Sequence, residues 1–356
     1  MPMAHRRAAR LAAACLITLA AVAARGRADV ASPVLAKYTQ RLEQSLGKAL
    51  GFLARQQESD GSFKTQMRGN TGITSLCVMA FLAKGHTPGL GPYGQVINRG
   101  IDYVLAQQQA NGLLVKAGAS HGPMYSHTIA TLMLSEVSGM VSPQRQQRID
   151  AALSKGLKLI LAAQKVRKSP PSHQGGWRYQ PGSTNCDISC TGWALMSLRS
   201  SRNNGATVPL DAIEQAVRFV MNCRMPDGGF AYQPGSGSGL ARTGTALLCL
   251  ELCGRHRDAA CVGAGKYILR RLPRSFGATY FYYGLYYCAQ GMFQLGGSEW
   301  EKFATHMYEM MLKFQKPDGS WPQGGGGEAR AGTSYSTAMG VLAMSVSYRQ
   351  LPIYQR

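Results

Sequence analysis

A short stretch that begins at Asp187 carries residue types suited to acid chemistry. It reads DISCTGWALMSL, so a carboxyl group and the thiol of Cys190 come just before an apolar run that is typical of a buried helix. A carboxyl group beside an apolar site can donate a proton in general acid catalysis. Asp187 is therefore the candidate catalytic residue of this sequence.

Cationic and aromatic residues are the candidates for ligand binding. A cation next to the amino terminus of a helix adds to the partial positive charge there, which favours a phosphate, diphosphate or carboxylate group. Next to this cationic site we expect an apolar cavity lined by aromatic side chains. The run TYFYYGLYYCAQGMF at 279–293 would form part of its wall. The alternative is structural, because such rings also form cores and threonines at helix starts are N-caps worth about 1 kcal/mol each. The predicted ligand-binding residues are His127, Trp193, Arg242, Tyr282, Tyr283 and Tyr287.

Other common catalytic motifs are absent from the sequence. It contains no His-Glu-x-x-His zinc motif and no phosphate-binding loop, and the GSGSG stretch at 235–239 has glycine where a nucleophile elbow has serine. Glycan hydrolysis would need paired carboxylates across a cavity, and only Asp187 falls in a suitable position. No cofactor is predicted.

The helices that must position these residues belong to a sequence repeat that occurs six times. KALGFLARQQESDGSF at 48–63 and MYEMMLKFQKPDGSW at 307–321 both give an amphipathic helix, a glutamine, an Asp-Gly turn and an aromatic residue. The turn supplies a left-handed residue that ends the helix, and we expect Gln56, Gln107 and Gln315 to hold the turn together. Related copies occupy 99–114, 155–164, 212–235 and 263–277.

A second, apolar helix follows each turn. Five copies align on Thr71, Thr128, Thr191, Thr243 and Thr337, and the remaining copy has Tyr283 there. Helices that are apolar nearly all round are buried, whereas the first helices carry lysine, arginine and glutamine on one face. The sequence thus predicts an all-α fold, an (α/α)6 barrel or toroid over 44–349. A closed ring is favoured over an open solenoid because the last repeat keeps a full apolar helix and carries no polar cap.

These repeats resemble the QW repeats of the prenyltransferase and squalene-cyclase superfamily. KALGFLARQQESDGSF and FQKPDGSW fit that pattern closely, and the likeness runs from Gln44 to about Arg349. The resemblance implies an α/α barrel with a site at the amino-terminal ends of the inner helices and an isoprenoid in its cavity. It does not settle the reaction.

The resemblance breaks at the residues that carry the family's chemistry. Class II cyclases of this kind begin with an Asp-x-Asp-Asp-Thr-Ala motif, whose central acid protonates an alkene. Here Asp187 and Thr191 match the motif, but Ser189 occupies the position of the central acid and Cys190 occupies the next position. The zinc motif of protein prenyltransferases has no match either. Zinc is left open only as an irregular site with His127 or His173.

Composition indicates a folded, exported and basic protein. Of 356 residues 45% are hydrophobic and 16% charged, which is enough for a sizeable core. Residues 1–28 have an arginine-rich start and an apolar run, which predicts a cleaved secretory signal and a periplasmic or extracellular location. Removing them takes away five arginines and no acids, so the net charge falls from +21 to +16. Residues 29–43 then form a lead-in and 350–356 a tail.

Two functions follow from these observations. The first is binding, with or without a reaction, of an amphiphilic isoprenoid-like molecule in the central cavity. The second is a non-enzymatic module that contacts an exported protein or an envelope polymer. The positive charge also allows peripheral contact with a membrane, whereas scattered basic residues argue against nucleic acid. Of the eight cysteines outside the signal, Cys186 and Cys190 are the pair to test for a disulfide.

Overall fold

The computed structural model describes residues 33–67, 70–116, 122–272 and 274–354, so the predicted signal segment lies outside the described residues. These residues form twelve α-helices and four short 3-10 turns. The outer helices are α2 (Pro33–Arg55), α4 (Gly94–Ala106), α6 (Pro143–Lys165), α8 (Leu210–Asn222), α10 (Ala259–Arg270) and α12 (Gly297–Phe314). The inner helices are α3 (Thr71–Ala83), α5 (Pro123–Glu136), α7 (Ile188–Asn203), α9 (Leu240–Leu252), α11 (Phe281–Leu295) and α13 (Gly332–Met344). The predicted all-α fold is confirmed.

The chain divides into two compact units after Thr39. In the first unit the described residues begin α2, where the Thr39 hydroxyl donates to the Leu35 carbonyl at 2.8 Å. The second unit, residues 40–356, contains every repeat. The fold described below is that of the second unit.

Burial separates the two kinds of helix as their sequences predict. Every residue of α3 is buried, because this helix is apolar nearly all round and has neighbours on both sides. In α8 the buried residues lie on one stripe: Ala212, Ile213, Ala216, Phe219 and Val220. This spacing is that of an amphipathic helix with its other face in solvent. The inner helices therefore form the core layer and the outer helices cover it.

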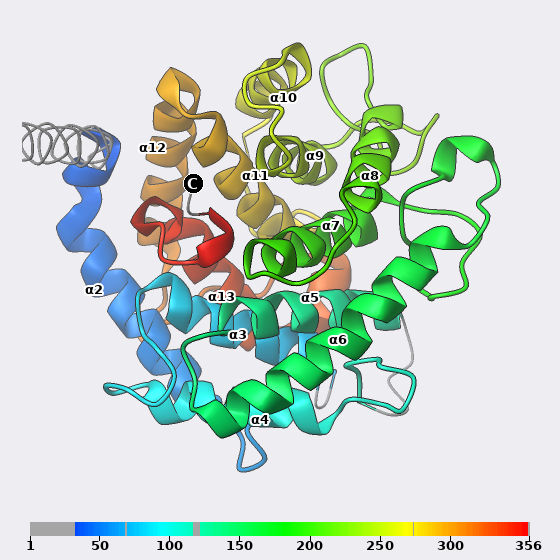
Figure 1. Cartoon of the computed structure of the whole chain (residues 1–356). Coiled ribbons are helices and arrows are strands. Elements are labelled where there is room, and N and C mark those ends of the chain that lie inside the picture. The colour runs from blue at the N-terminus through cyan, green and yellow to red at the C-terminus, as the bar shows by residue number, and fades with distance from the viewer. Residues whose placement is uncertain (1–32, 68–69, 117–121, 273, 355–356) are drawn as a thin grey trace, which may run out of the picture. The chain divides into compact units, whose positions relative to one another are not determined.

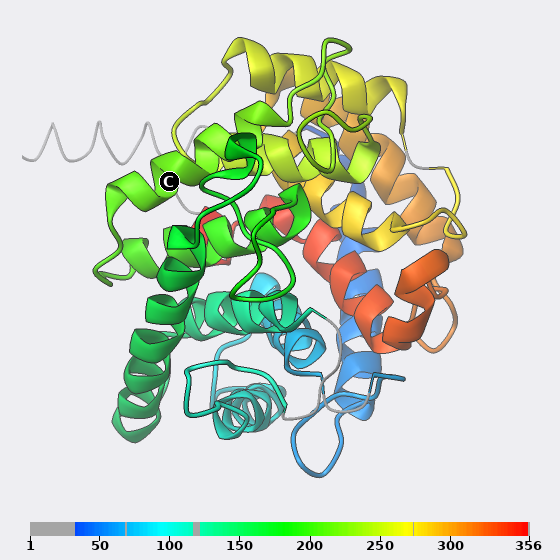
Figure 2. The ribbon, with the colours of Figure 1, turned by 90° about the vertical axis from the view of Figure 1, so that its right-hand side faces the viewer.

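The inner helices form a closed ring (Figure 2). Each of them contacts the inner helices of the repeats before and after it, and α13 contacts α3. Close approach needs small residues: a Cβ atom on Gly244 of α9 would lie 2.7 Å from the backbone nitrogen of Cys288 in α11. The open solenoid is thereby excluded for this chain.

In four of the six repeats a glutamine joins the outer helix to the outer helix of the next repeat. The side-chain amide of Gln57 donates to Gly61 O in its own turn and to Val96 O in α4, at 3.1 and 2.8 Å. Gln108 and Gln164 make the same pair of bonds to their own turns and to α6 and α8. The predicted role is thus correct, but Gln57 and Gln108 perform it, one residue after Gln56 and Gln107.

The last of these links closes the ring. Gln315 donates to Gly319 O and to Ser45 O in α2, both at 2.9 Å. Gly319 has φ +94°, and a Cβ atom there would lie 2.2 Å from the carbonyl oxygen of Lys48. Only glycine fits both the left-handed backbone and this close contact. The turn of the final repeat therefore rests directly on the first outer helix.

Replacing Gln315 with leucine should weaken this closure. The change leaves two partly buried carbonyl oxygens without their donor, which we expect to lower the free energy of unfolding by about 1–3 kcal/mol. Denaturant unfolding monitored by circular dichroism measures the loss. The control is Gln323→Leu, an exposed position in the loop that follows the turn. An equal effect of the two substitutions would contradict the closing role.

The interior of the ring is filled by aromatic side chains. Trp193 of α7 stacks on Tyr286 of α11, with ring centroids 5.4 Å apart and planes at 11°, and meets Tyr287 at 5.2 Å. Helices α7 and α11 are not ring neighbours, because α9 lies between them. These contacts therefore cross the interior. The apolar cavity expected between these rings is occupied by the rings themselves.

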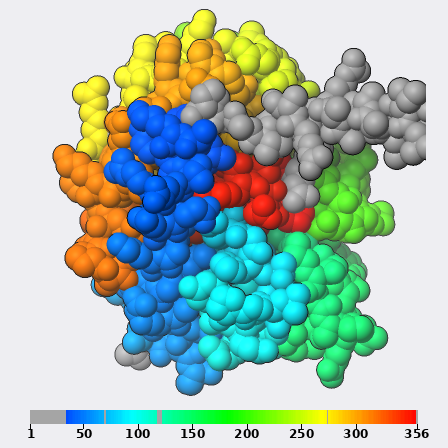
Figure 3. Space-filling model, turned by 90° about the vertical axis from the view of Figure 1, so that its left-hand side faces the viewer, coloured from blue at the N-terminus to red at the C-terminus, as the bar shows by residue number. Residues whose placement is uncertain are grey.

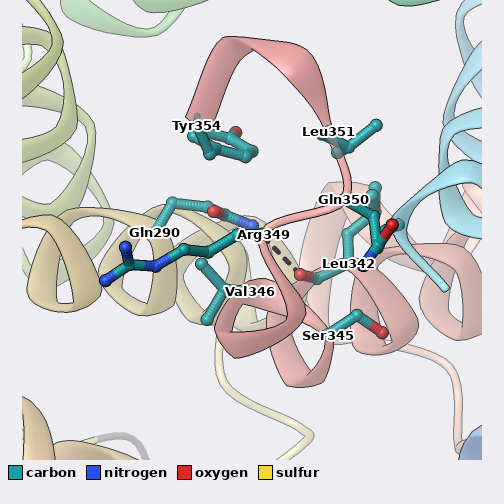
Figure 4. Close-up of a pocket in the computed structure, with 9 residues that line it drawn as sticks. Gln290, Leu342, Ser345, Val346, Arg349, Gln350, Leu351 and Tyr354 are labelled. Carbon is teal, nitrogen blue, oxygen red and sulfur yellow. Dashed lines mark hydrogen bonds between the residues drawn. The ribbon is translucent and has the colours of Figure 1, made fainter. Parts of the chain in front are cut away.

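The C-terminal residues cover the end of the ring where the inner helices finish, on the face shown in Figure 3. Tyr354, in the 3-10 turn Pro352–Tyr354, is 4% exposed, and its hydroxyl lies 2.7 Å from that of Tyr286. Figure 4 shows the small cavity beneath it, about 10 Å³ in volume, where the Gln290 amide donates to Leu342 O. Leu351, Ile353 and Tyr354 of the predicted tail are thus part of the packed interior.

Within residues 33–354, the described helices include none with both the length and the apolar content needed to cross a bilayer. This finding concerns the barrel helices alone.

Candidate functional site

Asp187 caps the amino terminus of α7 at the mouth of the ring. Its Oδ1 accepts hydrogen bonds from the backbone N–H groups of Ser189 and Cys190, at 2.9 and 2.8 Å, as an N-cap aspartate does. Its Oδ2 lies 3.3 Å from Nη1 of Arg178. The side chain is fully buried. Both carboxyl oxygens are therefore engaged in holding this corner of the barrel.

The protonation of Asp187 depends on opposing influences. Burial raises the pKa of its carboxyl group, whereas the bonds from Cys190 N and Ser189 N and the charge of Arg178 act to lower that pKa. Burial likewise raises the pKa of the Cys190 thiol far above its ordinary range. Cys190 is therefore a neutral thiol and not a nucleophilic thiolate.

Two guanidinium groups flank one tyrosine beside Asp187. Arg178 lies over the ring of Tyr232 at 5.3 Å and over that of Tyr179 at 4.5 Å. Arg242 lies over Tyr232 at 5.9 Å, and its Nη1 donates to Gly237 O at 2.7 Å. The hydroxyls of Tyr179 and Tyr232 form a short hydrogen bond. The loop before α7 and the loop before α9 are joined here.

This cluster has more positive than negative charge. Asp187 pairs with Arg178, but within the described ranges no carboxylate lies at ion-pair distance from Arg242. Arg178, Arg242 and Tyr232 are all half-buried, so their polar atoms remain open to solvent in part. In Figure 2 the segment between α6 and α7 lies in front of the ring. The cluster of Arg178, Tyr179, Asp187, Tyr232 and Arg242 is called the mouth cluster below.

A second buried carboxyl group lies at the rim and was not predicted. Glu328 accepts from the backbone N–H groups of Tyr282 and Tyr283 at 3.1 and 2.8 Å, and from the Tyr335 hydroxyl at 2.9 Å. Burial raises its pKa, and these hydrogen bonds lower it. Glu328 precedes α13 in sequence but caps α11. The position of Glu328 relative to Thr337, the aligned threonine of its own repeat, therefore did not indicate that it caps a helix of another repeat.

His127 lies apart from the mouth cluster. Its Nδ1 accepts from Leu114 N at 3.1 Å and its Nε2 donates to Gly156 O at 3.2 Å. The bond from Leu114 N has a counterpart in the third repeat, where the acceptor is a threonine: Trp177 N donates to Thr191 Oγ1 at 3.0 Å. His127 itself, and not Thr128, therefore occupies the threonine position of the second repeat. Burial lowers its pKa to about 4, so the ring is neutral.

The predicted aromatic residues are only partly brought together. Trp193 and Tyr287 meet in the interior, and Tyr283 contacts Tyr287 at 4.8 Å while its hydroxyl lies 3.0 Å from Thr245 Oγ1. The Tyr287 hydroxyl is buried and has no hydrogen-bond partner among the described residues. Tyr282 points elsewhere, since its hydroxyl donates to Pro322 O at 2.6 Å. Ligand binding by these residues and by His127 stays a prediction.

Metal ligands and disulfides were the other open questions. Among the described residues, no group of three histidine, cysteine or acidic side chains is placed to hold a metal ion. His173 accepts from Cys186 N through Nδ1 at 2.8 Å. Cys186 and Cys190 are both free, as are the other described cysteines.

Comparison with known proteins places the fold. A sequence profile of the prenyltransferase alpha-alpha toroid domain matches residues 13–165 and 173–279, and the chain belongs to this family. A search of curated proteins finds no match. The suspected membership of the toroid superfamily is confirmed.

Solved structures of the same fold include terpene cyclases. The apo type II terpene cyclase MstE from Scytonema is 15% identical, with a TM-score of 0.59 over 88% of this chain and 99% of that one. A variant of MstE in complex with its substrate geranylgeranyl dihydroxybenzoate is 14% identical, with a TM-score of 0.56 over 90% and 99%. A protein from Actinoplanes is 14% identical, with a TM-score of 0.53 over 86% and 99%. Identity at this level indicates a shared fold and leaves the activity open.

Proposed function

We propose that this protein is exported and binds an amphiphilic isoprenoid-like molecule with an anionic head at the mouth of its barrel. The head contacts Arg242 and Arg178, and the apolar chain lies against the half-buried rings of Tyr232 and Tyr179. It also contacts the half-buried ring of Tyr125, whose centroid lies 5.8 Å from that of Tyr179. The observation that carries the proposal is the convergence of two guanidinium groups on Tyr232 with a single carboxylate beside them.

Physical chemistry favours an anion at this place. Asp187 neutralises one guanidinium, which leaves Arg242 to pair with a ligand. The amino terminus of α7 adds partial positive charge, although Asp187 already accepts from two of its N–H groups. An aromatic platform suits the apolar part of the same ligand. One solved structure of the same fold, a variant of MstE, is in complex with geranylgeranyl dihydroxybenzoate, a molecule with an apolar chain and a polar head.

We propose binding without class II cyclisation. Ser189 stands where the resemblance places the central acid, and serine cannot protonate an alkene. Asp187 has both oxygens engaged, and the rings of Trp193, Tyr286 and Tyr287 occupy the interior where a substrate chain would fold. The proposed binding uses no metal and no cofactor.

The test of this proposal is a titration with Arg242→Ala. Farnesyl and geranylgeranyl diphosphate should bind saturably to the wild-type protein, and loss of a charge-assisted contact should weaken binding by roughly tenfold or more. Isothermal calorimetry measures both, with the uncharged prenyl alcohol as the comparison ligand. Arg224→Ala is the control variant, because Arg224 is an exposed arginine that follows outer helix α8 and is not part of the mouth cluster. Absence of saturable binding by any prenyl diphosphate would overturn the proposal.

A second function is favoured by the filled interior. A barrel plugged by Trp193, Tyr286 and Tyr354 needs no ligand to be stable, which suits a module that binds another exported protein or an envelope polymer. Two results together would support this function over the first. A partner would co-purify with the protein in stoichiometric amount from the exporting compartment, and the protein would bind none of the prenyl ligands.

A further inference from the structure

A second hollow of the barrel lies away from the mouth. It has a volume of about 740 Å³ and runs between α6 and the carboxyl ends of α5 and α7. The connection from α7 to α8, residues 204–207, forms its other wall, and α6 crosses the front of Figure 1 beside it. Volumes of this size are typical of sites for small molecules.

The α6 side of this groove has an apolar row and a cationic edge. Leu153, Leu157 and Leu161 line it at intervals of four residues, which places them on one face of the helix. Lys158 and Lys165 line it too and are exposed. Neither lysine has a carboxylate at ion-pair distance among the residues that the structure describes.

The far end of the same wall has the opposite charge. Asp150 lies there and accepts a hydrogen bond from the Gln146 amide at 2.7 Å. The groove is therefore polarised along α6, with its cations toward the carboxyl end of the helix. A ligand that complements it carries its negative charge at Lys158 and Lys165 and none near Asp150.

The α7 side holds a hydroxyl group without a partner. Ser201 is 1% exposed and lines the groove, and its Oγ has no hydrogen-bond partner in the part of the chain that the structure describes. A buried polar atom without a hydrogen-bond partner destabilises the protein that contains it. Its neighbours are satisfied, since Asn204 donates to Ser135 O at 2.7 Å and the hydroxyl oxygens of Ser200 and Ser135 are hydrogen-bonded at the same distance. A ligand oxygen in the groove would accept from Ser201.

We propose that this groove binds a single-chain anionic amphiphile, with its oxyanion head at Lys158 and Lys165 and its apolar chain along Leu161, Leu157 and Leu153. From Lys165 to Leu153 the groove extends about 18 Å along α6, which is room for a long chain. Ser201 lies fourteen residues of α7 from Asp187, or about 21 Å. The site is thus distinct from the mouth cluster and does not depend on the function proposed for it.

The probe for this site is dodecyl phosphate, used as a monomer with the full-length protein in calorimetric titration. Wild-type protein should bind it saturably, and the double variant Lys158→Gln/Lys165→Gln should bind at least about tenfold more weakly. Lys155→Gln is the matched control, because this exposed lysine of α6 does not line the groove. The same titrations are repeated with Arg242→Ala in every protein, so that dodecyl phosphate bound at the mouth cluster does not contribute and failure here and failure at the mouth are distinguishable.

Ser201→Ala separates a binding role from a structural one. It should weaken binding by about threefold to tenfold without lowering the melting temperature, because the hydroxyl makes no bond in the free protein. A fall in melting temperature would show that the hydroxyl is bonded within the fold and would overturn this part of the argument.

Three comparisons complete the test. Inorganic phosphate alone and dodecanol should each bind far more weakly than dodecyl phosphate. Equal binding of dodecanol would overturn the cationic head site. Binding only to vesicles that contain phosphatidic acid, with none to the monomer, would overturn the recessed site in favour of a membrane surface, and an equal loss in Lys155→Gln would show nonspecific attraction to a basic helix.

Discussion

Glu136→Gln is expected to remove a loss of stability that the wild-type protein undergoes as pH rises from about 4.5 to about 7. Glu136 is buried at the carboxyl end of α5, where Oε1 accepts a short bond from Ser200 and Oε2 accepts from Ile353 N at 3.1 Å. Burial raises the pKa of its carboxyl group to about 7, and these hydrogen bonds oppose the rise. No lysine or arginine pairs with it among the described residues.

The direction of this effect follows from proton binding. Between the unfolded pKa of about 4.5 and the folded pKa of about 7, the folded state keeps a proton that the unfolded state has released. Stability therefore falls as pH rises through this window and is constant above it. The pKa difference corresponds to a loss of about 3 kcal/mol.

Denaturant unfolding of both proteins at several pH values measures the difference. His127, whose lowered pKa makes the protein lose stability as pH falls from about 6.5 through 4, is present in both and cancels. The exposed Glu214→Gln serves as the control. A difference between wild type and Glu136→Gln that does not change with pH would refute the assignment.

Trp193→Ala should open the interior of the ring. Loss of a fully buried tryptophan that touches Tyr286 and Tyr287 should lower the free energy of unfolding by about 3–5 kcal/mol. The space left is apolar and enclosed, and such cavities take up small apolar molecules. Indole should therefore raise the melting temperature of the variant by mass action and leave that of the wild type unchanged.

Thermal unfolding with and without indole tests this. Trp193→Phe is the matched control, which should lose less stability and respond less to indole. A clear stabilisation of the wild type by indole would mean that the interior is open without mutation. That result would favour ligand binding inside the barrel over binding at its mouth.

The ring could be predicted from sequence because its cause is local and repeated. Each repeat pairs an amphipathic helix with a helix that is apolar all round, and a full apolar helix in the last repeat leaves closure as the way to bury it. The residue that links the repeats was misplaced by one, because two adjacent glutamines stand at the end of α2. Which of them turns inward depends on how that helix ends.

The site was less predictable because its contacts join distant repeats. Asp187 and Arg242 could be placed at the rim from their distance to a threonine. Arg178 could not, since the loop that carries it follows no repeat pattern, and Glu328 caps a helix that precedes it by almost fifty residues. The meeting of Trp193 with Tyr286 depends on the ring diameter, which no local pattern fixes. Such long-range pairs decide whether a barrel is hollow or solid.

The bond between Gln315 and Ser45 joins residues that are 270 positions apart. A ribosome adds about 5–20 residues per second, so the first outer helix waits on the order of tens of seconds for its partner. During that time the growing chain presents an unfinished edge that no neighbouring repeat covers. While this protein is being made, the exposed apolar edge of the incomplete barrel must therefore be protected from aggregation. Formation of the contact between Gln315 and Ser45 ends the need for that protection.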